Sequence, residues 1–154
     1  MKLTKLTGYI KRAEVVSESS PDAETKVGSI LVSKSTGSVI SEGYNGFVRG
    51  ADDDSLPKIR PQKYDFVIHA EQNLIYNAAR NGVRTDSCFL ISTHSPCVNC
   101  ARALYQSGID TVYFKTYYPG TDKIKDLGDL ELDYEPMGSF TKITIKPNVD
   151  RKHL

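Results

Sequence analysis

Apolar and polar positions follow two different rhythms along this chain. Across residues 70–82, Leu74, Ala78 and Gly82 recur at helical spacing, and Gly82 stands where a glycine commonly closes a helix. Short apolar runs between turn formers, such as Cys-Phe-Leu-Ile at 88–91, are typical of strands. The pattern predicts helices over 9–19, 70–81, 97–106 and 121–130, and strands over 27–33, 39–42, 87–92, 111–115 and 140–145.

The order of these elements sets the fold class. Strands alternate with helices, which predicts an α/β layered sheet with crossover connections. Lys-Ser-Thr-Gly-Ser at 34–38 has hairpin chemistry, so the first two strands should be antiparallel and the sheet mixed. Residues 43–67 form a long connection rich in turn formers. We interpret this connection as functional, because structureless loops of such length are uncommon in compact domains.

The composition is that of an ordinary globular domain. The chain has 154 residues, of which 39% are hydrophobic and 25% charged, so we expect one domain, 1–154, with a loose tail at 147–154. No run approaches the roughly 20 apolar residues of a membrane span, and the first residues lack the features of a secretory signal. We therefore expect a cytoplasmic protein.

The charge balance argues against nucleic acid or a membrane as partner. The formal net charge is +1, and the basic residues are scattered among nearly as many acids. Lys58, Arg60 and Lys63 come closest to a basic cluster, and we interpret them as part of a solvated loop. A small anionic substrate is compatible with this balance, because one or two well-placed cations suffice for it.

The three cysteines point to a metal rather than to disulfides. Cys88 lies in an apolar run and is predicted to be a buried small hydrophobe. Ser95 and Pro96 fit the N-cap and first position of a helix. This reading places Cys97 and Cys100 on one face of the first helical turn, where the helix N-terminus favours the thiolates that bind metal.

Two thiolates need a further ligand, and His69, at the start of the preceding helix, is the natural candidate. Three protein ligands leave the fourth tetrahedral position of zinc to water, as in catalytic zinc sites, and that water loses a proton near pH 7. Glu71 stands two residues from His69, where it can take this proton and pass it on. The pattern His-x-Glu followed by Pro-Cys-x-x-Cys is typical of zinc deaminases, in which hydroxide attacks C4 of cytosine or C6 of adenine.

Each half of this pattern is ambiguous alone, because Cys-x-x-Cys also occurs in redox motifs and in structural zinc knuckles. Together the halves leave two alternatives to a cytosine deaminase. One is a deaminase of another substrate, such as tRNA adenosine or free cytidine. The other is a non-catalytic zinc-stabilised module, which would need a fourth protein ligand. His94 is the nearby candidate for that ligand, although we expect it at the rim of the pocket or as a strand-end residue.

Several segments resemble the deoxycytidylate (dCMP) deaminases of cells and phages. They are His-Ala-Glu-Gln-Asn-Leu-Ile from residue 69, Ser-Pro-Cys-Val-Asn-Cys-Ala from residue 95, Val-Gly-Ser-Ile-Leu-Val from residue 27, and Gly-Tyr-Asn-Gly-Phe-Val-Arg-Gly from residue 43. The resemblance implies zinc-dependent hydrolysis of dCMP to dUMP, which supplies thymidylate synthesis. It also implies the cytidine deaminase-like three-layer α/β/α sandwich, with a mixed five-stranded sheet.

The resemblance further implies roles for individual residues. It places one zinc per chain on His69, Cys97 and Cys100, and the proton donor on Glu71. The positions that it assigns to substrate binding are Asn45, Ala70 and Tyr118, to which we add Arg49 as a candidate for the 5′-phosphate.

Regulation and assembly are implied by the resemblance alone. Family enzymes are often hexamers that dCTP activates and dTTP inhibits through the Gly-Tyr-Asn-Gly region, so we expect a homo-oligomer with an effector site at Gly43, Tyr44 and Gly46. Many members have Pro where Val48 stands. Some hold a second zinc through Cys and His in the loop before the active-site motif. Residues 48–68 contain neither Cys nor His, so we expect a single zinc ion. Whether the enzyme prefers dCMP or dCTP stays open.

Overall fold

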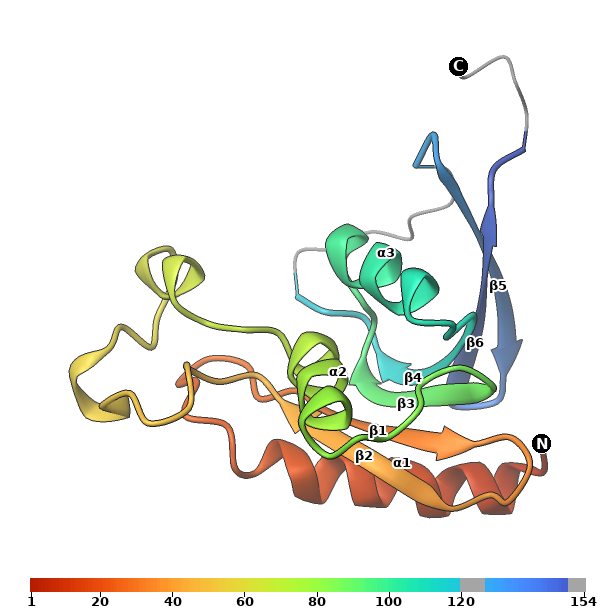
Figure 1. The fold of residues 1–154 in the computed structure, drawn as a ribbon, viewed down its shortest axis with the longest axis horizontal. Coiled ribbons are helices and arrows are strands. Elements are labelled where there is room, and N and C mark those ends of the chain that lie inside the picture. The colour runs from red at the N-terminus through yellow and green to blue at the C-terminus, as the bar shows by residue number, and fades with distance from the viewer. Residues whose placement is uncertain (120–126, 150–154) are drawn as a thin grey trace.

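The computed structural model of this protein describes residues 1–119 and 127–149. Its frame is one mixed sheet of six strands in the order β2-β1-β3-β4-β6-β5 (Figure 1). Strands β3 and β4 pair in parallel, and the other neighbouring pairs are antiparallel. The predicted mixed α/β sheet is therefore confirmed. The strands are β1 (Gly28–Ser33), β2 (Val39–Tyr44), β3 (Cys88–His94), β4 (Thr111–Thr116), β5 (Leu130–Met137) and β6 (Phe140–Pro147).

Helices cover both faces of the sheet. Helix α1 (Leu3–Ser17) lies on one face, and α2 (Ala70–Arg80) and α3 (Val98–Gln106) lie on the other (Figure 1). Strand β1 shows why its residues suit this position. Ile30 and Val32 belong to the core under α1, whereas Leu31 belongs to the core under α2 and α3. A strand buried on both faces reads as a continuous apolar run, and the result is the three-layer α/β/α arrangement.

Two glycines let helices approach the sheet closely. A Cβ added at Gly28 would lie 2.0 Å from the backbone oxygen of Ala13 in α1, and one added at Gly43 would lie 2.4 Å from the backbone nitrogen of Leu74 in α2. No side chain fits at either distance, so both positions require glycine. The close approach at Gly43 positions α2 on the sheet, and the N-terminus of α2 carries the His69 motif.

The C-terminal part differs from its prediction, because the sheet has six strands rather than five. The unpredicted β5 alternates, with Leu130 and Leu132 buried and their neighbours exposed, and it lies at the sheet edge, where Pro136 is tolerated. The predicted helix over 121–130 is wrong at its end, because Leu130 begins β5. Residues 121–126 of that helix, and 150–154 of the predicted tail, lie outside the described residues.

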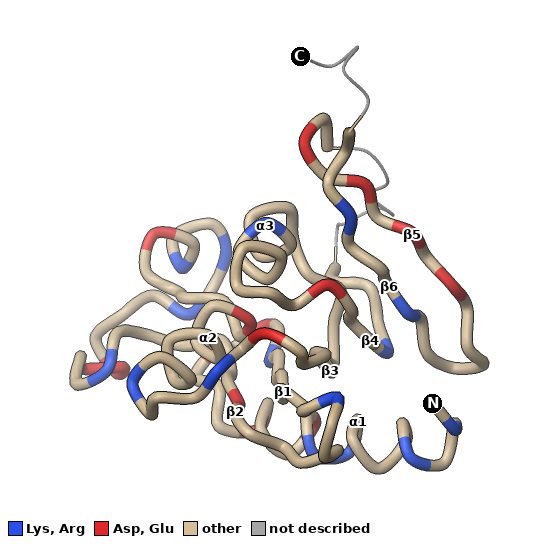
Figure 2. Tube along the Cα trace, turned by 45° about the vertical axis from the view of Figure 1, so that its right-hand side comes forward, with Lys and Arg blue, Asp and Glu red and all other residues tan. Residues whose placement is uncertain are grey.

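The long connection after β2 is folded back onto the domain. It contains two short 3₁₀ turns, η1 (Asp53–Ser55) and η2 (Gln62–Asp65), and a single β-bridge joins Gly46 to Ile68 just before α2. This bridge ties the start of the connection to its end. Figure 2 shows acidic and basic residues interspersed along the trace. In the described part of the chain, no helix combines the length and the apolar character needed to cross a bilayer.

Candidate metal centre and active site

The N-termini of α2 and α3 bring one nitrogen and two sulfur donors together. His69 is the N-cap of α2, Cys97 is the N-cap of α3, and Cys100 lies in the first turn of α3. The Nδ1 atom of His69 lies 3.4 Å from Cys97 Sγ and 3.3 Å from Cys100 Sγ. All three donor atoms lie within 4.8 Å of one another.

These separations fit a zinc ion. Zn–S bonds of about 2.3 Å and Zn–N bonds of about 2.0 Å place nitrogen and sulfur ligands about 3.5 Å apart at a tetrahedral angle. The observed separations of 3.3 and 3.4 Å are close to this value. The three residues predicted from the sequence are therefore placed to hold one zinc ion.

The surroundings of the cysteines favour metal binding. A hydrogen bond from Cys100 and the neighbouring His69 lower the pKa of the Cys97 thiol to about 4, although burial opposes the change. The same hydrogen bond, together with burial, raises the pKa of Cys100. The backbone N–H of Cys100 also donates to Cys97 Sγ at 3.4 Å. The site thus stabilises a thiolate, which is the form of cysteine that binds metal.

The helix of Cys97 starts later than the sequence predicts. We predicted Ser95 as the N-cap, but Cys97 takes that position and its sulfur accepts the capping hydrogen bond. The Ser95 hydroxyl instead accepts a hydrogen bond of 3.0 Å from the backbone N–H of Tyr118. Ser95 therefore connects the loop before α3 to the segment after β4.

Glu71 stands beside these donors in the first turn of α2. Only 4% of its surface is exposed, and burial raises the pKa of its carboxyl above the usual range. A carboxyl group whose pKa is shifted toward neutrality is suited to both taking and giving a proton. Glu71 therefore lies at the metal centre, and its predicted role in proton transfer stays a prediction.

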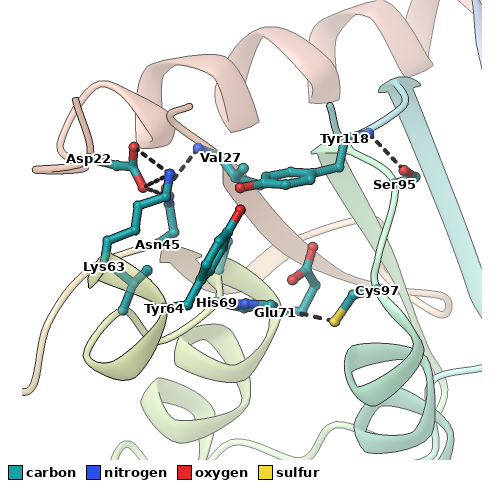
Figure 3. Close-up of a pocket in the computed structure, with 12 residues that line it drawn as sticks. Asp22, Val27, Asn45, Lys63, Tyr64, His69, Glu71, Ser95, Cys97 and Tyr118 are labelled. Carbon is teal, nitrogen blue, oxygen red and sulfur yellow. Dashed lines mark hydrogen bonds and ion pairs between the residues drawn. The ribbon is translucent and has the colours of Figure 1, made fainter. Parts of the chain in front are cut away.

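A cavity of about 240 Å³ opens from this centre. Its volume lies a little below the range of about 300–1,000 Å³ that is typical of pockets for drug-sized ligands. Figure 3 shows its lining side chains, with Glu71 and Cys97 on one side and Asp22 and Lys63 on the other. Its lining residues are Asp22, Val27, Asn45, Lys63, Tyr64, Val67, His69, Ala70, Glu71, Ser95, Cys97 and Tyr118.

Three of the residues predicted to bind substrate line this cavity, namely Asn45, Ala70 and Tyr118. The Asn45 side chain accepts a hydrogen bond from the Val27 N–H at 2.8 Å and donates to the Thr25 carbonyl at 2.9 Å. Asn45 is therefore held rigidly at the cavity wall. The roles of all three residues toward a substrate stay predictions.

Arg49 and His94, although described, are not among the residues that line the cavity. The Arg49 guanidinium donates to Asn77 Oδ1 of α2 at 2.8 Å. His94 ends β3, contacts the Thr93 hydroxyl at 2.8 Å and packs edge-to-face on Tyr118. The assignment of Arg49 to the phosphate stays a prediction. His94 lies at the end of a strand, which is one of the two positions expected for it.

The three residues expected to form an effector site occupy different surroundings. Gly43 is buried against α2, Gly46 pairs with Ile68, and Tyr44 is 40% exposed. Gly43 thus has a structural reason to be glycine, because an added Cβ would meet the backbone of α2. The predicted role of the three residues in effector binding stays a prediction.

The sequence analysis missed a buried charged pair at the far side of the cavity. Lys63 is 1% exposed, and its ammonium donates to both carboxylate oxygens of Asp22 at 2.8 and 3.0 Å. The interpretation of this segment as a solvated loop is therefore wrong for Lys63. Burial raises the pKa of Asp22, but the hydrogen bond from Lys63 and those from two backbone N–H groups outweigh it, so the pKa is lowered.

Comparison with known proteins supports the assignment of the centre. Residues 4–116 match the model of the cytidine and deoxycytidylate deaminase zinc-binding region. A probable deoxycytidylate deaminase of Caenorhabditis elegans is 38% identical over 116 residues, covering 73% of this chain and 57% of the relative. The deoxycytidylate deaminase of phage T4 is 31% identical over 183 residues, covering 90% of this chain and 94% of the relative.

A solved structure gives the same picture for the fold. The dCMP deaminase of cyanophage S-TIM5, in complex with dCMP and dUMP, is 34% identical with a TM-score of 0.66, and the match covers 79% of this chain and 88% of that chain. The predicted cytidine deaminase-like fold is thereby confirmed, with one strand more than expected. Because the family model spans most of the sequence, the chain belongs to the cytidine and deoxycytidylate deaminase zinc-binding family.

Proposed function

We propose that the protein hydrolyses dCMP to dUMP and ammonia in a zinc-dependent reaction. The observation that carries the proposal is the position of Glu71. This buried carboxyl group lines the same cavity as His69 and Cys97, directly beside the three metal donors. The named activities of the phage relatives support dCMP as the substrate.

The residues divide the chemistry between them. His69, Cys97 and Cys100 hold the metal, which when bound supplies a Lewis acid that lowers the pKa of water to near 7. The Glu71 carboxylate accepts one proton from the attacking water and passes it to N3 of the cytosine. It then takes the second proton, from the hydroxyl group on C4, and passes it to the leaving 4-amino group. The C4–O bond forms, the C4–N bond breaks, and ammonia leaves. Such proton transfer typically contributes about 10²- to 10⁴-fold in rate.

The shape of the cavity supports one orientation of the nucleotide. The base must place C4 near Glu71 and Cys97, so its sugar points toward the side that Asn45, Tyr64 and Tyr118 line. The hydrogen bonds that fix Asn45 keep this wall in place before substrate arrives. A preorganised wall of this kind lowers the entropic cost of orienting the substrate.

Three finer features belong to the same proposal. We propose a homo-oligomer, with a hexamer favoured, that dCTP and dTTP regulate through Gly43, Tyr44 and Gly46. The family resemblance supports this, and the exposed Tyr44 ring offers a stacking surface for a base. We also propose a cytoplasmic location, because the metal ligands include two cysteines that must stay reduced.

A turnover panel tests the proposal. The zinc-loaded protein is assayed with dCMP, dCTP, deoxycytidine and CMP, each with and without added dCTP and dTTP. We expect dCMP to have the highest kcat/KM, and we expect a chelator to abolish turnover until zinc is restored. Preferential turnover of dCTP, deoxycytidine or CMP would contradict the assignment of substrate.

A further inference from the structure

A side-chain hydrogen bond joins two segments that line the cavity. The Ser95 hydroxyl, in the loop before α3, accepts a hydrogen bond of 3.0 Å from the backbone N–H of Tyr118 (Figure 3). The Ser95 backbone N–H donates in turn to the Thr116 carbonyl at 2.9 Å. Because Ser95 and Tyr118 both line the cavity, these two bonds fix how the loop that carries Cys97 lies against the segment that carries Tyr118.

Tyr118 depends on such bonds because it lies beyond the end of its strand. Strand β4 ends at Thr116, which pairs with His94 of β3, and Tyr118 comes two residues later. The Tyr118 ring extends over the cavity on the side opposite Glu71 (Figure 3). A side chain on a segment outside regular secondary structure is positioned by the contacts that its neighbours make with its backbone and its ring.

We propose that Ser95 is a positioning residue, which holds Tyr118 where its ring contacts the bound nucleotide. This inference rests on the proposed function, because it requires the predicted role of Tyr118 in substrate binding. With C4 of the base near the metal donors, the nucleotide passes along the wall to which Tyr118 belongs. Ser95 acts through Tyr118, so its role needs no direct contact with the substrate.

Two further contacts hold the Tyr118 side chain, and they limit the size of the expected effect. The ring packs edge-to-face on His94, with ring centroids 6.2 Å apart, and the hydroxyl accepts a hydrogen bond of 2.9 Å from Arg60. These contacts act on the side chain, whereas the bond to Ser95 acts on the backbone. Loss of the Ser95 hydroxyl should therefore shift Tyr118 without releasing it, with an effect of about 3- to 10-fold, as for one neutral hydrogen bond.

The kinetic test compares Ser95→Ala with Ser95→Thr, which keeps the hydroxyl group. Ser95→Ala is expected to raise KM for dCMP about 3- to 10-fold and to change kcat by less than about 2-fold, because it weakens a contact made equally in the ground state and the transition state. Ser95→Thr should return KM to within about 2-fold of the wild-type value. The matched control is Ser107→Ala, which removes a half-buried hydroxyl that donates to the Ala103 carbonyl at the C-terminal end of α3 and should leave KM unchanged.

A merely structural role of Ser95 would give a different result. Loss of folded or zinc-loaded enzyme lowers the apparent kcat and leaves KM unchanged. That result, or a loss of zinc from Ser95→Ala by metal analysis, would overturn the proposal.

A double variant tests whether Ser95 acts through the tyrosine. In a Tyr118→Ala background, Ser95→Ala should raise KM by less than about 2-fold, because the side chain that it positions is gone. An increase as large as the one in the wild-type background would show that Ser95 acts independently of Tyr118, which also contradicts the proposal.

Amide hydrogen exchange separates this inference from the proposed function, because it needs no turnover. It is followed by NMR on the zinc-loaded protein without nucleotide. The Tyr118 N–H should exchange at least about 10-fold faster in Ser95→Ala than in the wild type or in Ser95→Thr, since its hydrogen-bond acceptor is lost. Equal exchange rates would refute the inference even if the wild type deaminates dCMP. Faster exchange in a protein inert toward dCMP would support the anchoring of Tyr118 by Ser95 and contradict the proposed function alone.

Discussion

Replacing Lys63 with methionine tests how the far wall of the cavity is held. The Lys63 ammonium lies 2.8 Å from an Asp22 oxygen, and both side chains are at most 2% exposed. At an effective dielectric constant of about 20, the attraction across this distance is about 6 kcal/mol, and the cost of desolvating the two charges offsets much of it. The ion pair therefore contributes less net free energy to folding than is lost when one of its partners is removed.

Breaking the pair leaves the Asp22 carboxylate buried without its cation. Deletion of one partner of a buried pair typically costs about 3–5 kcal/mol. Asp22 keeps hydrogen bonds from the N–H groups of Glu24 and Thr25 and from the Asn45 amide, so we expect a value near the lower end, about 3 kcal/mol. With a urea m-value of about 2 kcal/mol/M, the unfolding midpoint should fall by about 1.5 M.

The measurement is urea unfolding at a fixed, saturating zinc concentration, because bound metal stabilises the folded state. Far-ultraviolet circular dichroism is the suitable signal, since the chain has no tryptophan. Lys34→Met is the matched control. Its ammonium pairs with Asp110 at 3.3 Å, but both side chains are about half exposed, so its loss should cost less than about 1 kcal/mol.

A double-mutant cycle with Asp22→Asn measures the coupling free energy between Lys63 and Asp22. If the two residues act as a pair, the loss of unfolding free energy in the double variant should be smaller than the sum of the two single losses by about 1.5 kcal/mol or more. Additive losses, or a Lys63→Met variant no less stable than Lys34→Met, would show that the buried pair does not hold the wall.

Three further predictions concern the packing of α2 against Gly43, the stability in acid and the zinc content. Gly43→Ala places a Cβ against the backbone of Leu74 and should cost about 1–3 kcal/mol, seen as a lower melting temperature and reduced turnover. The lowered pKa of Asp22 stabilises the fold above about pH 4, and this contribution is lost as the pH falls through the folded-state pKa, so acid titration of Lys63→Met should show a smaller drop. His94→Ala should retain one zinc per chain by metal analysis, and loss of zinc would make it a ligand.

The metal centre was predictable because its signals are local. Cys97 and Cys100 lie three residues apart at a helix start, and His69 and Glu71 share the first turn of another helix. Such spacing fixes which side chains can meet once the helices form. The geometry adds that the Cys97 sulfur itself caps its helix, which the residue type does not suggest.

The far wall was not predictable, because its partners are distant in sequence. Lys63 and Asp22 are separated by 41 residues, and a lysine in a polar connection is usually solvated. The edge strand β5 was missed for a different reason. Its alternation of Leu130 and Leu132 is short, and a helix interrupted by Gly128 was the competing interpretation.

The most direct test of the account is the turnover and zinc content of Glu71→Gln beside the wild type. The loss of dCMP absorbance and the zinc per chain are measured on the same samples. We expect one zinc in both proteins and a rate lower by about 10²- to 10⁴-fold in the variant, because the amide holds the position but cannot shuttle the proton. Normal turnover in Glu71→Gln, or a zinc-loaded wild type inert toward dCMP, would contradict the proposed function.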